Sequence, residues 1–160
     1  MINLKLGELA KILNGTVVGD PNAEVTGTVE TDSKLIGPGG LFFARPGEVT
    51  DGHKFVGDAL AKGAIAAVVQ RELAEAINQI IVENSEEALG LLAKWLVGEL
   101  KVKGKLKVVG ITGSNGKTTT KNMLREILSR AGSTIAPIES FNNRVGAPIS
   151  ILRADLQTQF

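Results

Sequence analysis

The chain has 160 residues, a mass of 16.8 kDa and 43% apolar residues, which suffices for one ordinary domain or two small ones. Its 18 Lys and Arg residues balance 17 Asp and Glu residues, so the net charge of +1 gives no reason to expect a nucleic-acid partner. Cysteine is absent, which excludes disulfides and thiolate-bound metals. We find no signal peptide at 1–13 and no run of about 18 apolar residues that would span a membrane, so a cytoplasmic location is the simplest expectation.

Apolar periodicity and chain-breaking residues predict alternating helices and strands over the first hundred residues. Apolar residues at helical spacing favour a short helix at 6–13 that ends at Asn14-Gly15. β-branched residues between 16 and 31, interrupted by Gly19-Asp20-Pro21-Asn22, predict two short strands around a turn. The other expected elements are a strand at 41–44, a helix at 55–62 closed by Gly63, a buried strand at 65–69, a helical turn at 73–76 and a strand at 79–82. A helix capped by Ser85 follows, whose apolar run continues to Leu100 and which ends in the stretch 101–105.

A lysine-rich stretch, Lys101-Val102-Lys103-Gly104-Lys105, is the predicted boundary between a domain at 1–103 and a second segment at 104–160. A solvated helix end is the alternative interpretation, and it agrees with a boundary there. After this stretch we expect a strand at 106–112, a loop at 113–116, a helix at 117–131, a strand at 134–138 and a helical turn or two at 148–154. Strand, helix and strand in this order form a βαβ unit, so the predicted fold class is α/β throughout.

The most informative stretch is Val108-Val109-Gly110-Ile111-Thr112-Gly113-Ser114-Asn115-Gly116-Lys117-Thr118-Thr119. Gly113 and Gly116 allow the backbone to approach a ligand closely, so that N–H groups at a helix N-terminus converge on phosphate oxygens. The predicted nucleotide-binding residues are Gly113, Ser114, Asn115, Gly116, Lys117, Thr118 and Thr119. In such a P-loop, Lys117 is the catalytic residue that reaches the terminal phosphates of ATP, and the Thr118 hydroxyl binds Mg²⁺. The alternative is a chance Gly-Lys-Thr in a loop, and Ile111 departs from the general pattern, which has Gly or Ala there.

Three motifs resemble one family in order and spacing. The loop at 112–119 is similar to the ATP loop of the Mur ligases and their folylpolyglutamate synthetase relatives, in which Ile111 is normal. Three upstream stretches resemble the amino-terminal domain of those ligases: Thr31-Asp32-Ser33-Lys34, Gly37-Pro38-Gly39-Gly40-Leu41-Phe42-Phe43-Ala44 and Asp51-Gly52-His53-Lys54-Phe55. Lys34 departs from the more usual Arg, which keeps the charge but loses a bidentate fork.

A downstream stretch distinguishes two branches of that family. It reads Ser140-Phe141-Asn142-Asn143-Arg144-Val145-Gly146-Ala147-Pro148. It resembles the branch that adds D-alanyl-D-alanine to UDP-N-acetylmuramoyl-tripeptide. The branch that adds the third peptide residue usually lacks the Phe-Asn-Asn run, and it is the alternative.

The resemblance implies an ATP-dependent amide ligase of peptidoglycan synthesis, and therefore a role in cell-wall biogenesis, cell shape and cell division. In the family, ATP phosphorylates the terminal carboxylate of the UDP-linked peptide, and the amine of D-alanyl-D-alanine attacks the acyl phosphate. Ser33 and Lys34 would hold the uridine diphosphate end, and Asn142 and Asn143 would contact the substrate. Without the family, Ser33 is equally part of a turn cap and the two asparagines form a turn. A lone histidine such as His53 is more often structural than catalytic.

The resemblance also implies that 104–160 corresponds to only the beginning of an ATPase domain. Strands without their neighbours would leave apolar faces at Val108, Val109, Ile111, Ile135 and Ile138, so we expect this segment to self-associate or to be marginally stable. The chain alone is predicted not to make product. Two other functions stay open: a non-catalytic module that binds a UDP-sugar and a nucleotide, and a small P-loop kinase. The kinase needs an acidic metal ligand and an Arg-rich lid, and neither follows Thr119.

Overall fold

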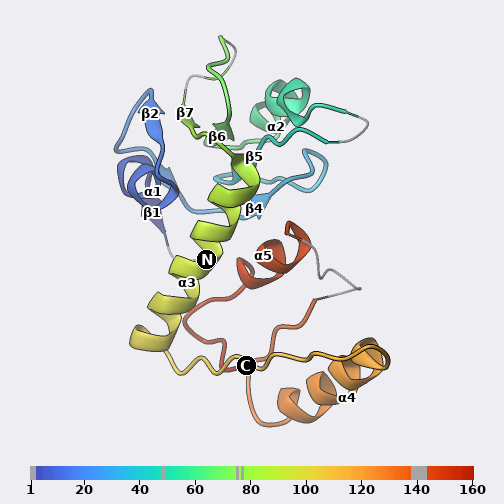
Figure 1. Ribbon diagram of the computed structural model, residues 1–160. Helices are drawn as coiled ribbons and strands as arrows, with labels where there is room; N and C mark the ends of the chain where they lie inside the picture. The colour runs from blue at the N-terminus through green and yellow to red at the C-terminus, as the bar shows by residue number, and fades with distance from the viewer. Residues whose placement is uncertain (1–2, 48–49, 75, 77, 138–143) are drawn as a thin grey trace.

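The computed structural model describes residues 3–47, 50–74, 76, 78–137 and 144–160. The elements are β1 (Leu4–Lys5), α1 (Leu6–Leu13), β2 (Thr16–Val18), β3 (Glu24–Val25), β4 (Val29–Glu30), β5 (Leu41–Phe43), the 3₁₀-helix η1 (Gly52–Phe55), α2 (Val56–Ala61), β6 (Ala66–Val69), β7 (Gln79–Ile81), α3 (Ser85–Lys103), α4 (Lys117–Ser129) and α5 (Gly146–Ile151). The fold class is α/β, as predicted (Figure 1).

One mixed sheet organises the first hundred residues. Its strand order is β2-β7-β6-β5-β4, in which β4, β5, β6 and β7 are parallel and β2 is antiparallel to β7. β1 and β3 form a separate antiparallel pair. All four residues of β6 are buried, because helices cover both faces of the sheet. Because β4, β5, β6 and β7 are parallel, their carboxyl ends lie at one common edge of the sheet. The loops that follow these strands carry polar side chains.

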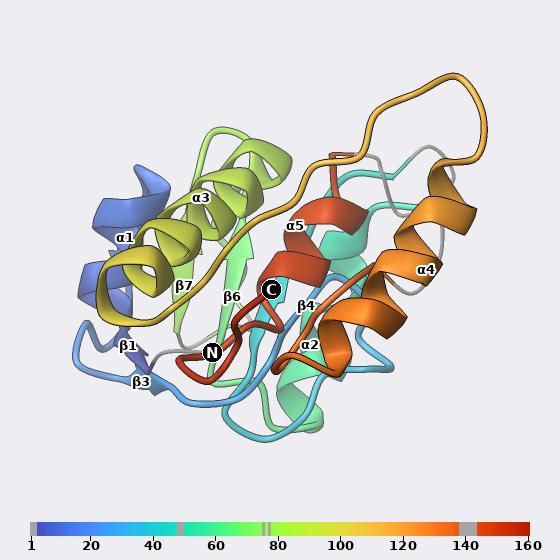
Figure 2. The same cartoon turned by 90° about the horizontal axis from the view of Figure 1, so that it is seen from below.

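Two apolar clusters lie on opposite faces of this sheet. Phe43 and Val68 belong to the cluster that contains buried residues of α1 and α3. Phe42 and Ala67, their neighbours in sequence, belong to the cluster that contains buried residues of α2. This alternation follows from the two-residue period of a strand. The sheet is thus the middle layer of three, with α1 and α3 on one side and α2 on the other (Figure 2).

The first helix and the strands of the sheet confirm the sequence-based predictions closely. α1 has the predicted bounds, and Asn14 ends it in the left-handed conformation at φ 53°. β5, β6 and β7 lie within the predicted segments at 41–44, 65–69 and 79–82. Gly63 follows α2 with φ 98°, as expected for a residue that closes a helix.

One of two short segments differs from the predictions. The segment 16–31 contains three short strands instead of two, and β2 and β3 pair with β7 and β1 rather than with each other. At 73–76 the N–H of Ala76 donates to the carbonyl of Leu73 at 3.3 Å, so this segment forms the single turn that was expected. The buried Gln79 side chain holds the segment, because it accepts from the N–H of Leu73 and donates to the carbonyls of Leu73 and Ala76.

The N-cap of α3 is Asn84, so the prediction of Ser85 was wrong by one residue. The Asn84 side chain accepts from the N–H groups of Glu86 and Glu87 at 2.9 and 3.1 Å. The Ser85 hydroxyl instead donates to the side-chain oxygen of Gln70 at 3.2 Å. The helix ends at Lys103, within the lysine-rich stretch where its end was expected.

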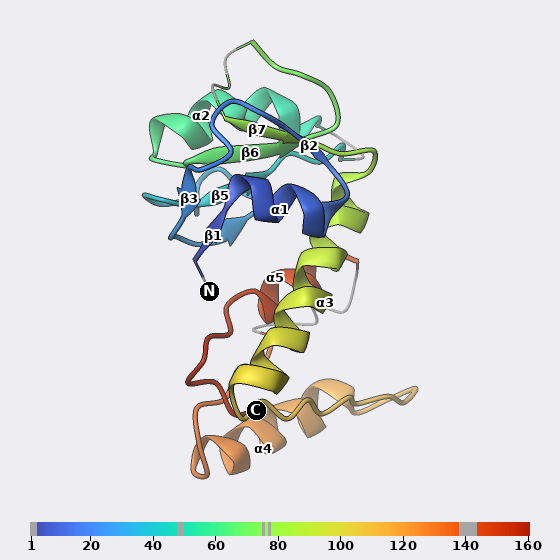
Figure 3. The same cartoon turned by 90° about the vertical axis from the view of Figure 1, so that its left-hand side faces the viewer.

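α3 connects the sheet to the second part of the chain (Figures 1 and 3). α5 packs against α3, and the buried Leu152 and Ala154 that follow α5 join the cluster formed by α1 and α3. Residues 145–154 are therefore anchored on the first domain, although they follow the predicted boundary at 103/104. That boundary stays a prediction.

The strands predicted at 106–112 and 134–138 do not form as strands in the described residues; Ile138 lies outside them. Both segments instead flank the end of the chain. The N–H of Lys107 donates to the carbonyl of Gln159 at 2.8 Å. Phe160 donates to the carbonyl of Ser133 at 3.1 Å and accepts from the N–H of Ile135 at 2.8 Å, which is the pattern of a single parallel bridge. Isolated bonds of this kind do not make a ladder. The two apolar segments therefore do not form strands, although their sequences favour them.

The second segment exposes much apolar surface. No residue of α4 is buried. Val108 and Val109 are 59% and 55% exposed, which confirms the prediction for these two residues, and Met123 and Ile127 of α4 are also exposed. Ile111 and Ile135, for which an exposed apolar face was also predicted, are partly buried. In the part of the chain that the structure describes, no helix has the length and apolar character needed to cross a membrane.

Candidate nucleotide and substrate site

The predicted phosphate-binding loop lies on the surface, directly before α4. Gly116 is the N-cap of α4 with φ 76°, and Gly113 has φ 153°. Both angles lie in the region that favours glycine. A Cβ at Gly116 would meet no atom within 4 Å, so space for a ligand is open above the loop.

The N-terminus of α4 has no side-chain cap, as is also the case at α1, α2 and α5. Asn84 caps α3, and Asp51 caps η1 by accepting from the N–H of His53. At α4 no side chain caps the first turn, and that turn holds no acidic residue. The first N–H groups of a helix have no acceptor within the helix, and they carry its positive dipole end. This terminus therefore offers donors and positive charge to an anion.

Lys117 adds a full positive charge at the same place. Its Nζ folds back over the loop and donates to the carbonyl oxygens of Gly113 and Ser114 at 2.5 and 3.4 Å. Thr118 and Thr119, the next residues of α4, are exposed. Backbone donors, an ammonium group and a hydroxyl thus lie within one helical turn, a set that fits the phosphates of ATP with Thr118 as the protein ligand of Mg²⁺. Among the described residues, no group of three or more His, Asp and Glu side chains is arranged to hold a metal ion.

Ser33 and Lys34 lie in a turn at the carboxyl end of β4. The Asp32 side chain accepts from the N–H of Lys34 at 2.8 Å, which is the turn cap that the sequence also allowed. Ser33 is buried, and its carbonyl accepts from Nζ of Lys62 at 2.9 Å. The Lys34 side chain is exposed. Binding of uridine diphosphate by these two residues stays a prediction, and Asn142 and Asn143 lie outside the described residues.

His53 is a structural residue, as the sequence favoured. It is buried, Nε2 accepts from the N–H of Gln70 at 2.9 Å, and Nδ1 lies 2.6 Å from a carboxylate oxygen of Asp51. Because Nε2 is an acceptor, this arrangement assigns the proton to Nδ1, which donates to Asp51. The N–H of His53 is the main cause that lowers the pKa of Asp51, and the Arg71 guanidinium, 2.9 Å from the other oxygen, lowers it further.

A cleft of about 270 Å³ separates the carboxyl edge of the sheet from α5. Thr31 and Asp32 line it beside the predicted residue Ser33. Three charged side chains in its walls were missed by the sequence analysis: Glu30, Arg45 and Arg153. They are far apart in the sequence, and no motif joins them. The packing of α5 on α3 brings Arg153 to this place.

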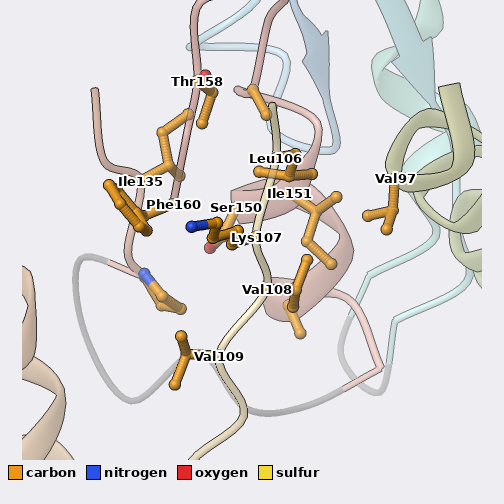
Figure 4. A pocket seen from close by; sticks show the side chains of 13 residues that line it. Val97, Leu106, Lys107, Val108, Val109, Ile135, Ser150, Ile151, Thr158 and Phe160 are labelled. Atoms are coloured by element: carbon orange, nitrogen blue, oxygen red, sulfur yellow. The ribbon is translucent and has the colours of Figure 1, made fainter. Parts of the chain in front are cut away.

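A second hollow of about 240 Å³ lies beneath the extended segment that carries Leu106 and Val108 (Figure 4). Its walls are mainly apolar. The Ser150 and Thr158 hydroxyls that reach it already donate within the chain, to the carbonyl of Gly146 and to Asp155 at 2.8 and 3.0 Å. We therefore interpret this hollow as a loosely packed core and not as a substrate site.

Comparison with known proteins identifies relatives along most of the chain. Residues 26–96 match the catalytic domain of the Mur ligase family, and residues 111–160 match the Mur ligase middle domain. The UDP-N-acetylmuramoyl-tripeptide–D-alanyl-D-alanine ligase of Mycobacterium leprae is 37% identical over an alignment of 186 positions, gaps included, which covers 100% of this chain and 36% of the relative.

Solved structures give the same result. MurF from Acinetobacter baumannii superposes with a TM-score of 0.87 at 33% identity and covers 99% of this chain and 35% of that chain. The MurF ligase from Thermotoga maritima, solved in complex with ADP, has a TM-score of 0.69 at 35% identity and covers 80% of this chain and 29% of that chain. The chain thus spans about a third of the length of the relatives that it matches.

Proposed function

Because this chain belongs to the Mur ligase family, we propose that it supplies the amino-terminal part of an ATP-dependent amide ligase, which joins D-alanyl-D-alanine to UDP-N-acetylmuramoyl-tripeptide. One observation carries the nucleotide part of this proposal: an uncapped helix N-terminus with Lys117 folded over its loop. The relatives, one of which was solved with ADP, support the choice of nucleotide.

The loop residues would neutralise charge while a phosphoryl group moves from ATP to a carboxylate. N–H groups at the start of α4 would orient the terminal phosphates, and the Lys117 ammonium would move from the carbonyls of Gly113 and Ser114 to a phosphate oxygen. Mg²⁺ bound beside the Thr118 hydroxyl would supply a further positive charge. The carboxylate oxygen bonds to phosphorus as ADP leaves, and the incoming amine then displaces phosphate from the acyl carbon.

The D-alanyl-D-alanine branch of the family is favoured over the branch that adds the third peptide residue. The relatives described above, at 33–37% identity, are MurF-type ligases, and the Phe141-Asn142-Asn143 run agrees with them.

Calorimetric titration of the 160-residue chain with Mg-ATP tests the nucleotide site. Lys117→Ala should weaken binding about ten- to a hundredfold, because a charge-assisted hydrogen bond is worth roughly 1.5–3 kcal/mol. Arg125→Ala is the matched control, since it removes an exposed positive charge from the same helix. Equal affinities of the two variants would contradict the site.

Titration with UDP-N-acetylmuramoyl-tripeptide tests the substrate. The proposal requires saturable binding of this compound by the wild-type chain. A chain that binds Mg-ATP but not the UDP-linked peptide would instead favour a module with no role in this ligation.

A further inference from the structure

The peptide group between Ser33 and Lys34 is held at both ends by charged side chains. Nζ of Lys62 donates to the carbonyl oxygen of Ser33 at 2.9 Å, and a carboxylate oxygen of Asp32 accepts from the N–H of Lys34 at 2.8 Å. Hydrogen bonds in which one group is ionised are stronger than neutral ones, and these two bonds polarise each other through the peptide group that they share. Together they fix the orientation of the turn after β4.

Lys62 belongs to a different layer of the fold from this turn. It is the C-cap of α2. Ala59 of α2 and Ile36, which follows the turn, are buried in the same apolar cluster, and this packing brings the end of α2 close to the turn. The carbonyl of Gly63 accepts from the N–H of Gly39 at 2.8 Å. The end of α2 therefore holds the connection between β4 and β5 at two points.

The two bonds leave the side chains of the turn available to a ligand. The Ser33 hydroxyl makes no hydrogen bond with a described residue, although Ser33 as a whole is buried. The Lys34 side chain is exposed and makes no ion pair with a described residue. These two side chains flank the peptide group that Lys62 and Asp32 hold, so the orientation of that group sets the directions in which they point.

We propose that Lys62 is a positioning residue, which orients Ser33 and Lys34 for the UDP-linked substrate and does not contact that substrate itself. The inference rests on the proposed function and on the prediction that these two residues hold the uridine diphosphate end. A turn that is ordered before the substrate arrives lowers the entropic cost of binding. Loss of the bond from Lys62 would return that cost to the binding step.

Calorimetric titration of the 160-residue chain with UDP-N-acetylmuramoyl-tripeptide tests the inference. Lys62→Met removes the charged donor and keeps an unbranched side chain. It should weaken binding about five- to thirtyfold, the factor that corresponds to ordering one backbone residue during binding. Lys94→Met is the matched control, because it removes an exposed lysine of α3, and it should stay within about twofold of the wild type.

The dependence of affinity on salt distinguishes positioning from direct contact. Lys34→Met should make the affinity less sensitive to salt, because it removes a cation that would pair with the diphosphate. Lys62→Met should leave the salt dependence unchanged. A salt dependence that falls in Lys62→Met as it does in Lys34→Met would mean that Lys62 binds the anion itself, and this result would overturn the inference.

A double-mutant cycle between positions 62 and 34 distinguishes positioning from a general contribution to stability. If Lys62 acts through Lys34, Lys62→Met should cost less affinity in a Lys34→Met chain than in the wild type. Additive losses would contradict positioning. In the free Lys62→Met chain, changes in the ¹H–¹⁵N NMR spectrum should be confined to residues 31–36 and to those around position 62, whereas changes throughout the sheet would indicate general destabilisation and overturn the inference.

Failure of this inference differs from failure of the proposed function. A wild-type chain that binds the UDP-linked peptide, with the same affinity in Lys62→Met, would overturn the role of Lys62 alone. A wild-type chain that does not bind this compound would overturn the substrate part of the proposed function, and the role of Lys62 with it.

Discussion

Nε2 of the buried His53 accepts a hydrogen bond from the backbone N–H of Gln70 at 2.9 Å, and this contact ties the segment before α2 to the end of β6. His53→Ala would leave that N–H without an acceptor and open a cavity. We expect a loss of about 2–3 kcal/mol in the free energy of unfolding, as for other buried polar deletions. Urea denaturation measures it, with the exposed neighbour Lys54→Ala as control. Equal stability of both variants would contradict a structural role for His53.

The pH dependence of stability tests Asp51, the partner of His53. The His53 N–H and then Arg71 lower the pKa of Asp51 below its ordinary value of 3.8. A carboxyl group whose pKa is lower in the folded state stabilises the fold above the unfolded-state pKa, and this contribution is lost as the pH falls below it. Asp51→Asn should therefore lower the melting temperature at pH 7 more than at about pH 3. A constant difference across this range would show that the charge of Asp51 contributes nothing.

Glu30 should behave in the opposite way. Its pKa is raised above the ordinary value of 4.5, mainly by burial, so the ionised form disfavours folding. The stabilising contribution of the protonated form is complete below the ordinary value and is lost as the pH rises through the folded-state pKa. Glu30→Gln should thus raise the melting temperature at neutral pH, and the gain should vanish at about pH 4. The exposed Glu72→Gln is the control, and a destabilised Glu30→Gln at neutral pH would contradict the account.

The exposed apolar surface of the second segment predicts self-association. Ile127 of α4 is 65% exposed, and Val108 and Val109 are similarly open. Light scattering after size-exclusion chromatography should give a mass that rises with concentration. Ile127→Lys should shift the chain toward the monomer, whereas Glu126→Lys, at the next position of the helix, should have a smaller effect. A strict, well-folded wild-type monomer at high concentration would refute this prediction.

The chain alone should be inactive as a ligase. It spans about a third of its relatives, and the whole reaction needs groups beyond the phosphate loop. Incubation with UDP-N-acetylmuramoyl-tripeptide, ATP and D-alanyl-D-alanine should yield no product above that of Lys117→Ala. Any turnover that Lys117→Ala abolishes would show that the described loop suffices for catalysis.

Local signals allowed much of the first domain to be predicted. The left-handed Asn14 and Gly63 end their helices, and the buried runs of β5 and β6 are strands because both faces of the sheet are covered. The cap of α3 was misplaced because Asn84 and Ser85 are both good N-caps. What decides between them is the hydrogen bond from Ser85 to Gln70, a residue fifteen positions away in the sequence.

Long-range packing limited the remaining predictions. The glycine-bearing loop before α4 was predictable because Gly113, Gly116 and Lys117 lie within a few residues of one another, whereas its binding of phosphate stays a prediction. The cleft lined by Glu30 and Arg153 was not predictable from the sequence, because it exists only when α5 packs on α3. In the same way, an apolar pattern at 106–112 indicates a strand only where a neighbouring strand completes the ladder, and here this segment has the single bond from Lys107 to Gln159.

The central claim is that backbone N–H groups at the start of α4 bind the phosphates of a nucleotide. The most direct measurement is a two-dimensional ¹H–¹⁵N NMR titration of the chain with Mg-ADP. We expect the largest shifts at the amides of residues 113–119, and loss of these shifts in Lys117→Ala. Nucleotide binding that leaves these amides unperturbed, or shifts that persist unchanged in Lys117→Ala, would contradict the account.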